Sequence, residues 1–202
     1  MNPLEEVIIL SSPKQDPARK YSYQDYLNWS EEERWELIHG SPFNMTPSPS
    51  RKHQHVLGQL AAEFTFFLRG KLCKAFVAPF DVRLFSEGNT DDQVTNVVQP
   101  DISVICDSKK LDNRGCKGSP DLIIEILSPS TGKMDRWVKY KLYEAAGVKE
   151  YWIVEPINET IEVFVINNQQ KYELSGVYGK EETLQVGIFD GLVINLHEVF
   201  SE

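Results

Sequence analysis

Two apolar segments of this chain carry a carboxylate, and they lie close together in the sequence. Asp101 lies in the run 97–105 and Glu125 in the run 121–127. An ionised acid inside an apolar strand is costly unless a partner compensates it. Divalent ions such as Mg²⁺ or Mn²⁺ prefer oxygen ligands, and one or two carboxylates are enough to hold one. The pair therefore predicts a shared metal that lowers the pKa of a water and stabilises charge on a phosphate oxygen.

A lysine beside such a site would hold the nucleophile and neutralise developing charge. Lys139 is the leading candidate because it lies on the helix expected directly after the Glu125 segment. Tyr143 follows four residues later and shares its helical face. Asp135 lies one turn before Lys139, so the alternative is an i,i+4 surface ion pair worth about a few tenths of a kcal/mol. The spacing alone favours that alternative.

The hydrophobic pattern predicts the elements that position these residues. Apolar residues recur every three or four positions over 51–69, which indicates a long amphipathic helix. A second helix is expected over 133–146. It lies between strands at 122–127 and 151–154, and the three segments form a right-handed βαβ crossover.

Shorter elements surround this core. Capping boxes at Ser22 with Asp25 and at Ser30 with Glu33 predict two short helices. Loops are expected at 46–50, 86–96 and 107–119, and further strands at 35–39, 41–45, 76–85, 161–166, 172–177, 184–189 and 192–196. This order predicts an α/β (α+β) fold, a mixed β-sheet flanked by helices with a β-rich C-terminal tail. Residues 1–20 are expected to form an N-terminal arm, and residues 21–202 a single domain.

Composition and charge exclude several classes of protein. The chain has 202 residues, of which 41% are hydrophobic and 25% charged, as in ordinary globular proteins. A net charge of −9 excludes a general polyanion binder, so a nucleic-acid site would need a local basic surface or metal ions. No run reaches the roughly 18 apolar residues of a membrane span. Residues 1–13 lack the pattern of a signal peptide, so we expect a cytoplasmic protein.

The cysteines predict neither a disulfide framework nor a zinc site. They are Cys73, Cys106 and Cys116, an odd number without CxxC spacing. We therefore expect three free thiols, buried or partly buried.

Several of these segments resemble the Uma-type restriction endonuclease family, within the PD-(D/E)xK nuclease superfamily. The resemblance covers about residues 20–195. Its motifs are Trp35-Glu36-Leu37-Ile38-His39-Gly40, His53-Gln54, Ala78 to Leu84, Gln99-Pro100-Asp101, Ser119 to Thr131 with Asp135, Lys139 and Tyr143, and Gly147 to Pro156. It implies a restriction-endonuclease-like core, a site that uses Mg²⁺ or Mn²⁺, DNA as substrate and a homodimer.

The resemblance also assigns roles to individual residues. Pro100-Asp101 corresponds to the PD motif and Glu125 to the second acid. The superfamily places a lysine two residues after that acid, but Leu127 stands there in this chain. The family supplies a lysine from the following helix instead, which here is Lys139.

Four further residues, one of them the Tyr143 already named, are candidates for the site. Glu36 would complete the metal shell, although an exposed strand position is the alternative from the residues alone. His53 matches the family's helix histidine, and a helix N-terminus favours an anion such as phosphate; a solvated basic turn fits the spacing equally. Tyr143 would support the ligands or contact the substrate beside His53. Asp81, in an alternating strand, is a candidate extra metal ligand.

We therefore expect a metal-dependent endonuclease that hydrolyses DNA phosphodiester bonds. The alternative is a catalytically inactive module of the same fold that binds nucleic acid or protein, which the missing strand lysine and the net charge favour. A structural dimer is compatible with both, and Trp152, Phe164 and the C-terminal strands are the candidate sheet-edge interface.

Overall fold

The computed structural model describes residues 12–13, 19–30, 32–45, 49–128 and 132–201. Its centre is a six-stranded mixed sheet in the order β12-β11-β10-β9-β6-β3. The strands are β3 (Lys74–Val77), β6 (Ile102–Ile105), β9 (Leu122–Ile126), β10 (Glu150–Glu155), β11 (Thr160–Ile166) and β12 (Tyr172–Gly179). The pair β9 and β10 is parallel, and the other neighbours are antiparallel. The expected βαβ crossover is therefore present.

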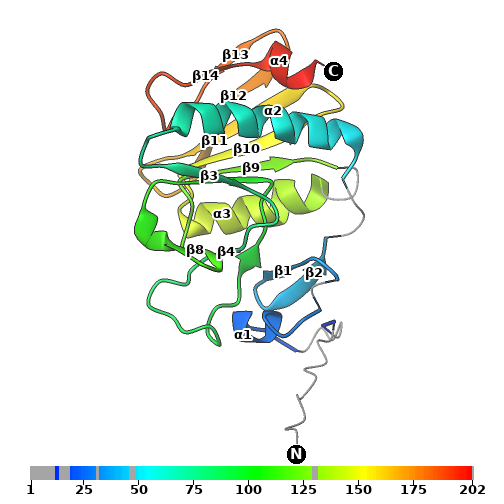
Figure 1. Cartoon of the computed structure of the whole chain (residues 1–202), viewed down its shortest axis with the longest axis vertical. Coiled ribbons are helices and arrows are strands. Elements are labelled where there is room, and N and C mark those ends of the chain that lie inside the picture. The colour runs from blue at the N-terminus through cyan, green and yellow to red at the C-terminus, as the bar shows by residue number, and fades with distance from the viewer. Residues whose placement is uncertain (1–11, 14–18, 31, 46–48, 129–131, 202) are drawn as a thin grey trace, which may run out of the picture.

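Helices cover both faces of this sheet (Figure 1). One face carries α2 (Arg51–Leu68) and the short C-terminal α4 (Leu196–Phe200). The other face carries a π-helical turn, η2 (Met134–Lys139), which continues directly into α3 (Tyr140–Ala146). The mixed sheet between helices confirms the predicted fold class.

Two smaller sheets complete the structure. One has the order β2-β1-β5-β4-β8-β7 and the other pairs β13 with β14. Their strands are β1 (Trp35–Ile38), β2 (Ser41–Asn44), β4 (Val82–Arg83), β5 (Val97–Val98), β7 (Leu111–Asp112), β8 (Gly115–Lys117), β13 (Thr183–Gln185) and β14 (Val193–Asn195). The remaining helices are α1 (Tyr23–Tyr26), which has the predicted capping box at Ser22, and a 3₁₀ turn at Ser108–Lys110.

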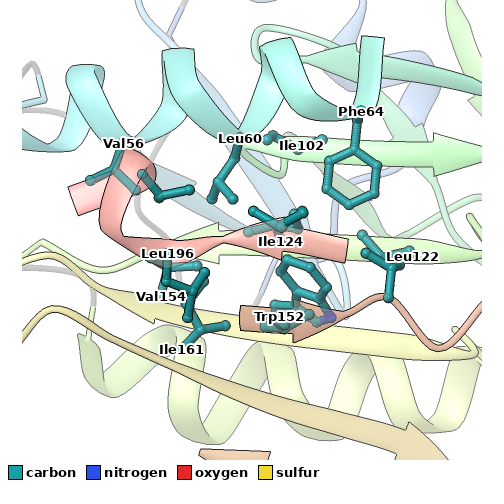
Figure 2. Packing of buried hydrophobic residues seen from close by; sticks show 14 of the residues in the cluster. Val56, Leu60, Phe64, Ile102, Leu122, Ile124, Trp152, Val154, Ile161 and Leu196 are labelled. Carbon is teal, nitrogen blue, oxygen red and sulfur yellow. The ribbon is translucent and has the colours of Figure 1, made fainter. Parts of the chain in front are cut away.

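Alternation along β9 divides its side chains between two cores. Leu122, Ile124 and Ile126 belong to the core under α2, where Figure 2 shows Leu60 above Ile124 and Phe64 above Leu122. Ile123 packs on the α3 side, and alternation places Glu125 there too. The strand therefore buries its carboxylate on the face from which η2 approaches.

Three predicted elements differ from the structure, two of them because a proline interrupts a predicted strand. The strand expected at 76–85 divides into β3 and β4, which belong to different sheets, and the break falls at Pro79, which has no N–H for a ladder. The run 97–105 likewise divides at Pro100 into β5 and β6. The expected loop at 107–119 contains the 3₁₀ turn and the β7–β8 hairpin.

Other expectations from the sequence need correction or lie outside the described residues. The helix predicted to begin at Ser30 is absent from the described residues on either side of position 31. The structure also contains α4, which the sequence pattern did not predict. Trp152 is fully buried in the core, so it cannot belong to a surface interface. Most of the expected arm at 1–20, and positions 46–48 of the expected loop, lie outside the described residues.

The prediction of three free cysteines is wrong. Cys73 lies directly before β3 and Cys106 directly after β6. Because Lys74 pairs with Ile105, the same antiparallel register puts Cys73 opposite Cys106. Their Cα atoms are 3.9 Å apart and the sulfurs form a disulfide. The antiparallel register creates this proximity across 33 positions of sequence. Cys116 is free and buried, as expected.

The α2 core gives a first testable expectation. Phe64 is fully buried and packs against Trp152, whereas Phe66 on the same helix is 75% exposed. Phe64→Ala should lower the free energy of unfolding by about 3–5 kcal/mol, because it leaves a cavity in a packed core. Phe66→Ala is the matched control and should change it by no more than about 0.5 kcal/mol. Urea denaturation of both variants measures the difference; equal losses would contradict this packing.

Candidate active site

A buried lysine lies between carboxylates from three elements. The Lys139 Nζ at the end of η2 is 2.8 Å from Glu36 Oε1 on β1 and 3.0 Å from Glu125 Oε1 on β9. Asp135 Oδ1, one turn earlier in η2, is 3.6 Å away. The side chains of Lys139, Glu36 and Glu125 are only 5%, 5% and 6% exposed. We call Lys139, Glu36, Glu125 and Asp135 the acid–lysine cluster.

Two further groups fix the glutamates of this cluster. The Tyr143 hydroxyl donates to Glu125 Oε1 at 2.7 Å, so Lys139 and Tyr143 share a helical face as predicted. The main-chain N–H of Gln99 donates to Glu36 Oε1 at 2.9 Å. Each glutamate therefore presents one oxygen to the ammonium and to a second donor, which defines its orientation.

Asp101 lies beside the cluster and contacts His53. The pairing of Ile102 with Ile124 places Asp101 at the end of β6 next to the Glu125 position of β9. Asp101 Oδ2 accepts a 2.7 Å hydrogen bond from the Ile126 N–H and lies 3.3 Å from His53 Nε2. His53 comes from the first turn of α2, and its buried Nδ1 has no hydrogen-bond partner among the described residues.

The surroundings shift the pKa of both charged partners. Burial raises the pKa of Glu125 well above its usual value, Lys139 opposes this, and the carboxylates of Asp135, Asp101 and Glu36 raise it further. Burial alone would lower the pKa of Lys139, but Glu125, Glu36 and Asp135 outweigh it and hold that pKa well above the usual value. Lys139 is therefore charged, and Glu125 takes up a proton more readily than an exposed glutamate.

The donor set fits a divalent metal in chemistry and in charge. The carboxylates of Glu36, Asp101, Glu125 and Asp135 face one ammonium and one imidazole, which leaves an excess of negative charge. Carboxylate oxygens are also the ligands that Mg²⁺ prefers. Within the described part of the chain, no three His, Cys, Asp or Glu side chains are gathered as a ready metal site, and the Lys139 ammonium lies between Glu36 and Glu125.

The remaining candidates lie apart from the cluster. The Asp81 carboxylate accepts hydrogen bonds from the Tyr26 hydroxyl and from the Gln99 side chain, and it contacts none of the cluster acids directly. Burial raises its pKa. Asp121, the residue before β9, accepts a hydrogen bond from the main-chain N–H of Cys106, which is a structural role.

Sequence reasoning underestimated two residues. The Asp135–Lys139 pair exists, but the surface ion pair favoured by spacing alone is wrong because both side chains are buried. Gln99 received no role, yet it contacts Glu36, Asp81 and Arg34. Its place two residues before Asp101, in an apolar run, was the available signal. A polar side chain in such a run needs partners.

Comparisons with known proteins identify the family and the fold of this chain. The family model described as Uma2, putative restriction endonuclease, matches residues 23–197. An uncharacterized protein of Synechocystis sp. is 29% identical over 155 residues, which are 75% of this chain and 77% of that protein. The crystal structure of a putative nuclease belonging to DUF820 from Anabaena variabilis superposes with a TM-score of 0.69 at 22% identity, covering 89% of this chain and 97% of that one. At that identity the likeness shows the fold alone.

The cluster makes the stability of the fold depend on Lys139. Lys139→Met should lower the free energy of unfolding by about 3–5 kcal/mol at pH 8, because it leaves buried carboxylates without their cation. Acids with a raised folded-state pKa destabilise the fold as pH rises above their unfolded pKa, so the loss should be smaller at pH 5. Urea denaturation at both pH values measures this.

The control for this variant is Lys141→Met, on the exposed side of the same helix. It should have little effect at either pH. A loss for Lys139→Met that is the same at pH 5 and pH 8 would show that packing, and not charge, explains the effect.

Proposed function

Because this chain belongs to the Uma2 family, described as putative restriction endonucleases, we propose that it is a metal-dependent endonuclease that hydrolyses phosphodiester bonds of DNA. The observation that carries the proposal is the set of buried carboxylates around Lys139, beside Asp101 and His53. Proteins seldom bury several acids on one cation. A site that must bind a cation and handle a phosphate accounts for the stability that this arrangement costs.

The proposed metal ligands are Asp101, Glu125 and Glu36, with Mg²⁺ or Mn²⁺ as the ion. When bound, such an ion supplies a water of lowered pKa and neutralises charge on a phosphate oxygen. Asp101 and Glu125 lie on neighbouring strands, so the sheet holds them in a fixed relation. Glu36, from the second sheet, shares the Lys139 ammonium with Glu125.

Lys139 is proposed to orient the attacking water and to neutralise developing negative charge. Its ammonium already reaches two of the proposed ligands. Tyr143 keeps Glu125 in place through its hydroxyl. His53, at the first turn of α2, is the proposed phosphate contact, and its unpartnered Nδ1 supports a role toward a bound group. Asp81 is a weaker candidate for the metal shell, because its carboxylate faces Tyr26 and Gln99.

A plasmid-cleavage assay tests this proposal. The wild-type protein should nick supercoiled DNA with Mg²⁺ or Mn²⁺ and should not do so with EDTA. Asp101→Asn should lower the rate by about 100-fold or more, as expected when an electrostatic contact to the transition state is removed. Asp190→Asn, at an exposed position between β13 and β14 and outside the site, is the control and should cleave like the wild type.

Calorimetric titration with Mn²⁺ separates the nuclease from the alternative, an inactive binding module of the same fold. A nuclease should bind Mn²⁺ in a way that Asp101→Asn weakens. If the folded protein binds DNA or a protein partner equally well with and without Asp101, and binds no Mn²⁺, the binding module is correct.

We also propose that the protein is a homodimer and acts in the cytoplasm. None of the helices among the described residues is long and apolar enough to cross a membrane. Strand β12 ends the central sheet, so its outer edge pairs with no other described strand, and Leu174 and Val177 on it are 55% and 53% exposed. An open edge with apolar side chains favours pairing with a second copy.

Sedimentation equilibrium tests the dimer. The wild type should sediment as a dimer, and Leu174→Lys on β12 should shift it toward the monomer, since like charges would meet at a two-fold axis. Phe66→Lys, at an exposed position on α2 and outside the C-terminal strands, is the control. A monomeric wild type would contradict the dimer and leave the nuclease proposal intact.

A further inference from the structure

Arg34 has an unusual environment among the arginines of this chain. Its Nε and Nη2 both donate to the side-chain oxygen of Gln99, at 3.1 and 2.9 Å. No carboxylate among the described residues pairs with it. Four other arginines each form a salt bridge, namely Arg19 with Asp25, Arg83 with Asp112, Arg114 with Asp91, and Arg136 with Glu155 and Glu162. Arg34 therefore forms no salt bridge with the described residues, although its positive charge opposes the rise in the pKa of Asp81, which lies on the other side of the Gln99 amide.

Gln99 is held so that only its oxygen can face Arg34. Its Nε2 donates to Asp81 Oδ1 at 2.9 Å and to the Tyr26 hydroxyl at 3.0 Å. The Asp81 carboxylate only accepts hydrogen bonds, and the Tyr26 hydroxyl already donates its hydrogen to it. The Gln99 amide must therefore turn its N–H₂ toward both groups. The carbonyl oxygen is then left for the guanidinium. A neutral acceptor thus fixes the direction of Arg34 without cancelling its charge.

Arg34 lies at the edge of the proposed active site. It directly precedes β1 and extends the β1–β2 ladder, because its carbonyl accepts the Met45 N–H at 2.9 Å. Residues two apart in a strand share a face, so Arg34 and Glu36 point the same way. Gln99 joins them, since its main chain binds Glu36 and its side chain binds Arg34. Arg34 is half-buried, whereas Lys139 is enclosed by carboxylates.

We propose that Arg34 is a phosphate-binding residue of this site and that Gln99 is the residue that positions it. A guanidinium has five N–H donors and binds phosphate oxygens two at a time. Gln99 occupies two of its nitrogens, and Nη1 donates to none of the described residues. In a chain of net charge −9, a cation that forms no salt bridge within the described part of the chain, beside four acids, would offset their repulsion of the DNA backbone. This inference rests on the proposed nuclease function and names one of its substrate contacts.

The salt dependence of DNA binding tests the proposal. All proteins carry Asp101→Asn to prevent cleavage, and binding to a fluorescein-labelled 20-base-pair duplex is followed by anisotropy at constant Mg²⁺ and increasing NaCl. Each phosphate contact contributes about 0.9 to the slope of log K against log salt concentration. Arg34→Gln should reduce the slope by about 0.9 and weaken binding by about 10-fold or more. Arg34→Lys keeps the charge and should keep the slope, with a smaller loss of affinity.

Arg69→Gln is the matched control. Arg69 follows the last residue of α2, roughly 24 Å along the helix from His53. It contacts the Phe66 ring and should leave both slope and affinity unchanged. An unchanged slope for Arg34→Gln would overturn the proposal. So would a loss of slope in Arg34→Lys, because that effect would come from the fold and not from charge.

The failure of this inference and the failure of the nuclease proposal give different results. If the parent protein binds the duplex and Arg34→Gln binds it identically, only the role of Arg34 is wrong. If the parent protein shows no binding at any salt concentration and the wild type cleaves no plasmid, DNA is not the substrate and both proposals fail. For the active enzyme, Arg34→Gln should raise KM more than it lowers kcat, as expected for a residue that binds substrate in the ground state.

Discussion

One buried ammonium determines how the site is built. Lys139, at the end of the turn η2, forms charge-assisted hydrogen bonds with Glu36 of β1 in one sheet and with Glu125 of β9 in another, and an ion pair with Asp135, in a place with little access to water. Removing charges from water is costly, and only close opposite charges with further hydrogen bonds repay the cost. The glutamates therefore cannot move independently of the lysine. The same contacts that fix their oxygens leave the cluster with more negative than positive charge.

Each of the two sheets positions some of the acids of the site. The central sheet supplies Asp101 and Glu125 on neighbouring strands, where backbone pairing fixes their separation. The second sheet supplies Glu36 on β1. Pro100 marks the crossing between them, because the run 97–105 belongs to one sheet before this residue and to the other after it. Gln99 and Asp101, on either side of Pro100, consequently reach different parts of one site.

Charge is distributed unevenly around this site. The chain is acidic overall and concentrates carboxylates at the cluster, which would repel a polyanion. The proposed nuclease needs that negative charge for a metal and needs positive charge for a phosphate. The arrangement around Gln99 reconciles the two requirements, since Arg34 is oriented by a neutral amide while Lys139 is held by acids. Asp101 outweighs the effect of burial and raises the pKa of His53 above its usual value, which favours its cationic form.

The sequence determined the elements with a strong period and the residues that cannot be buried without a partner. The long helix α2 and the crossover from β9 to β10 follow from local spacing, which also puts Lys139 and Tyr143 on one helical face. The cost of burying charge indicates that Glu125 needs a partner, but the contact with Lys139 came from the tertiary structure. The tertiary structure decided what depends on pairing between distant segments. Register across β3 and β6 joined Cys73 to Cys106, and the meeting of β1 with η2 buried the Asp135–Lys139 pair. Spacing along a chain fixes which residues share a face, but only packing of one element on another fixes which face is dry and which atoms meet.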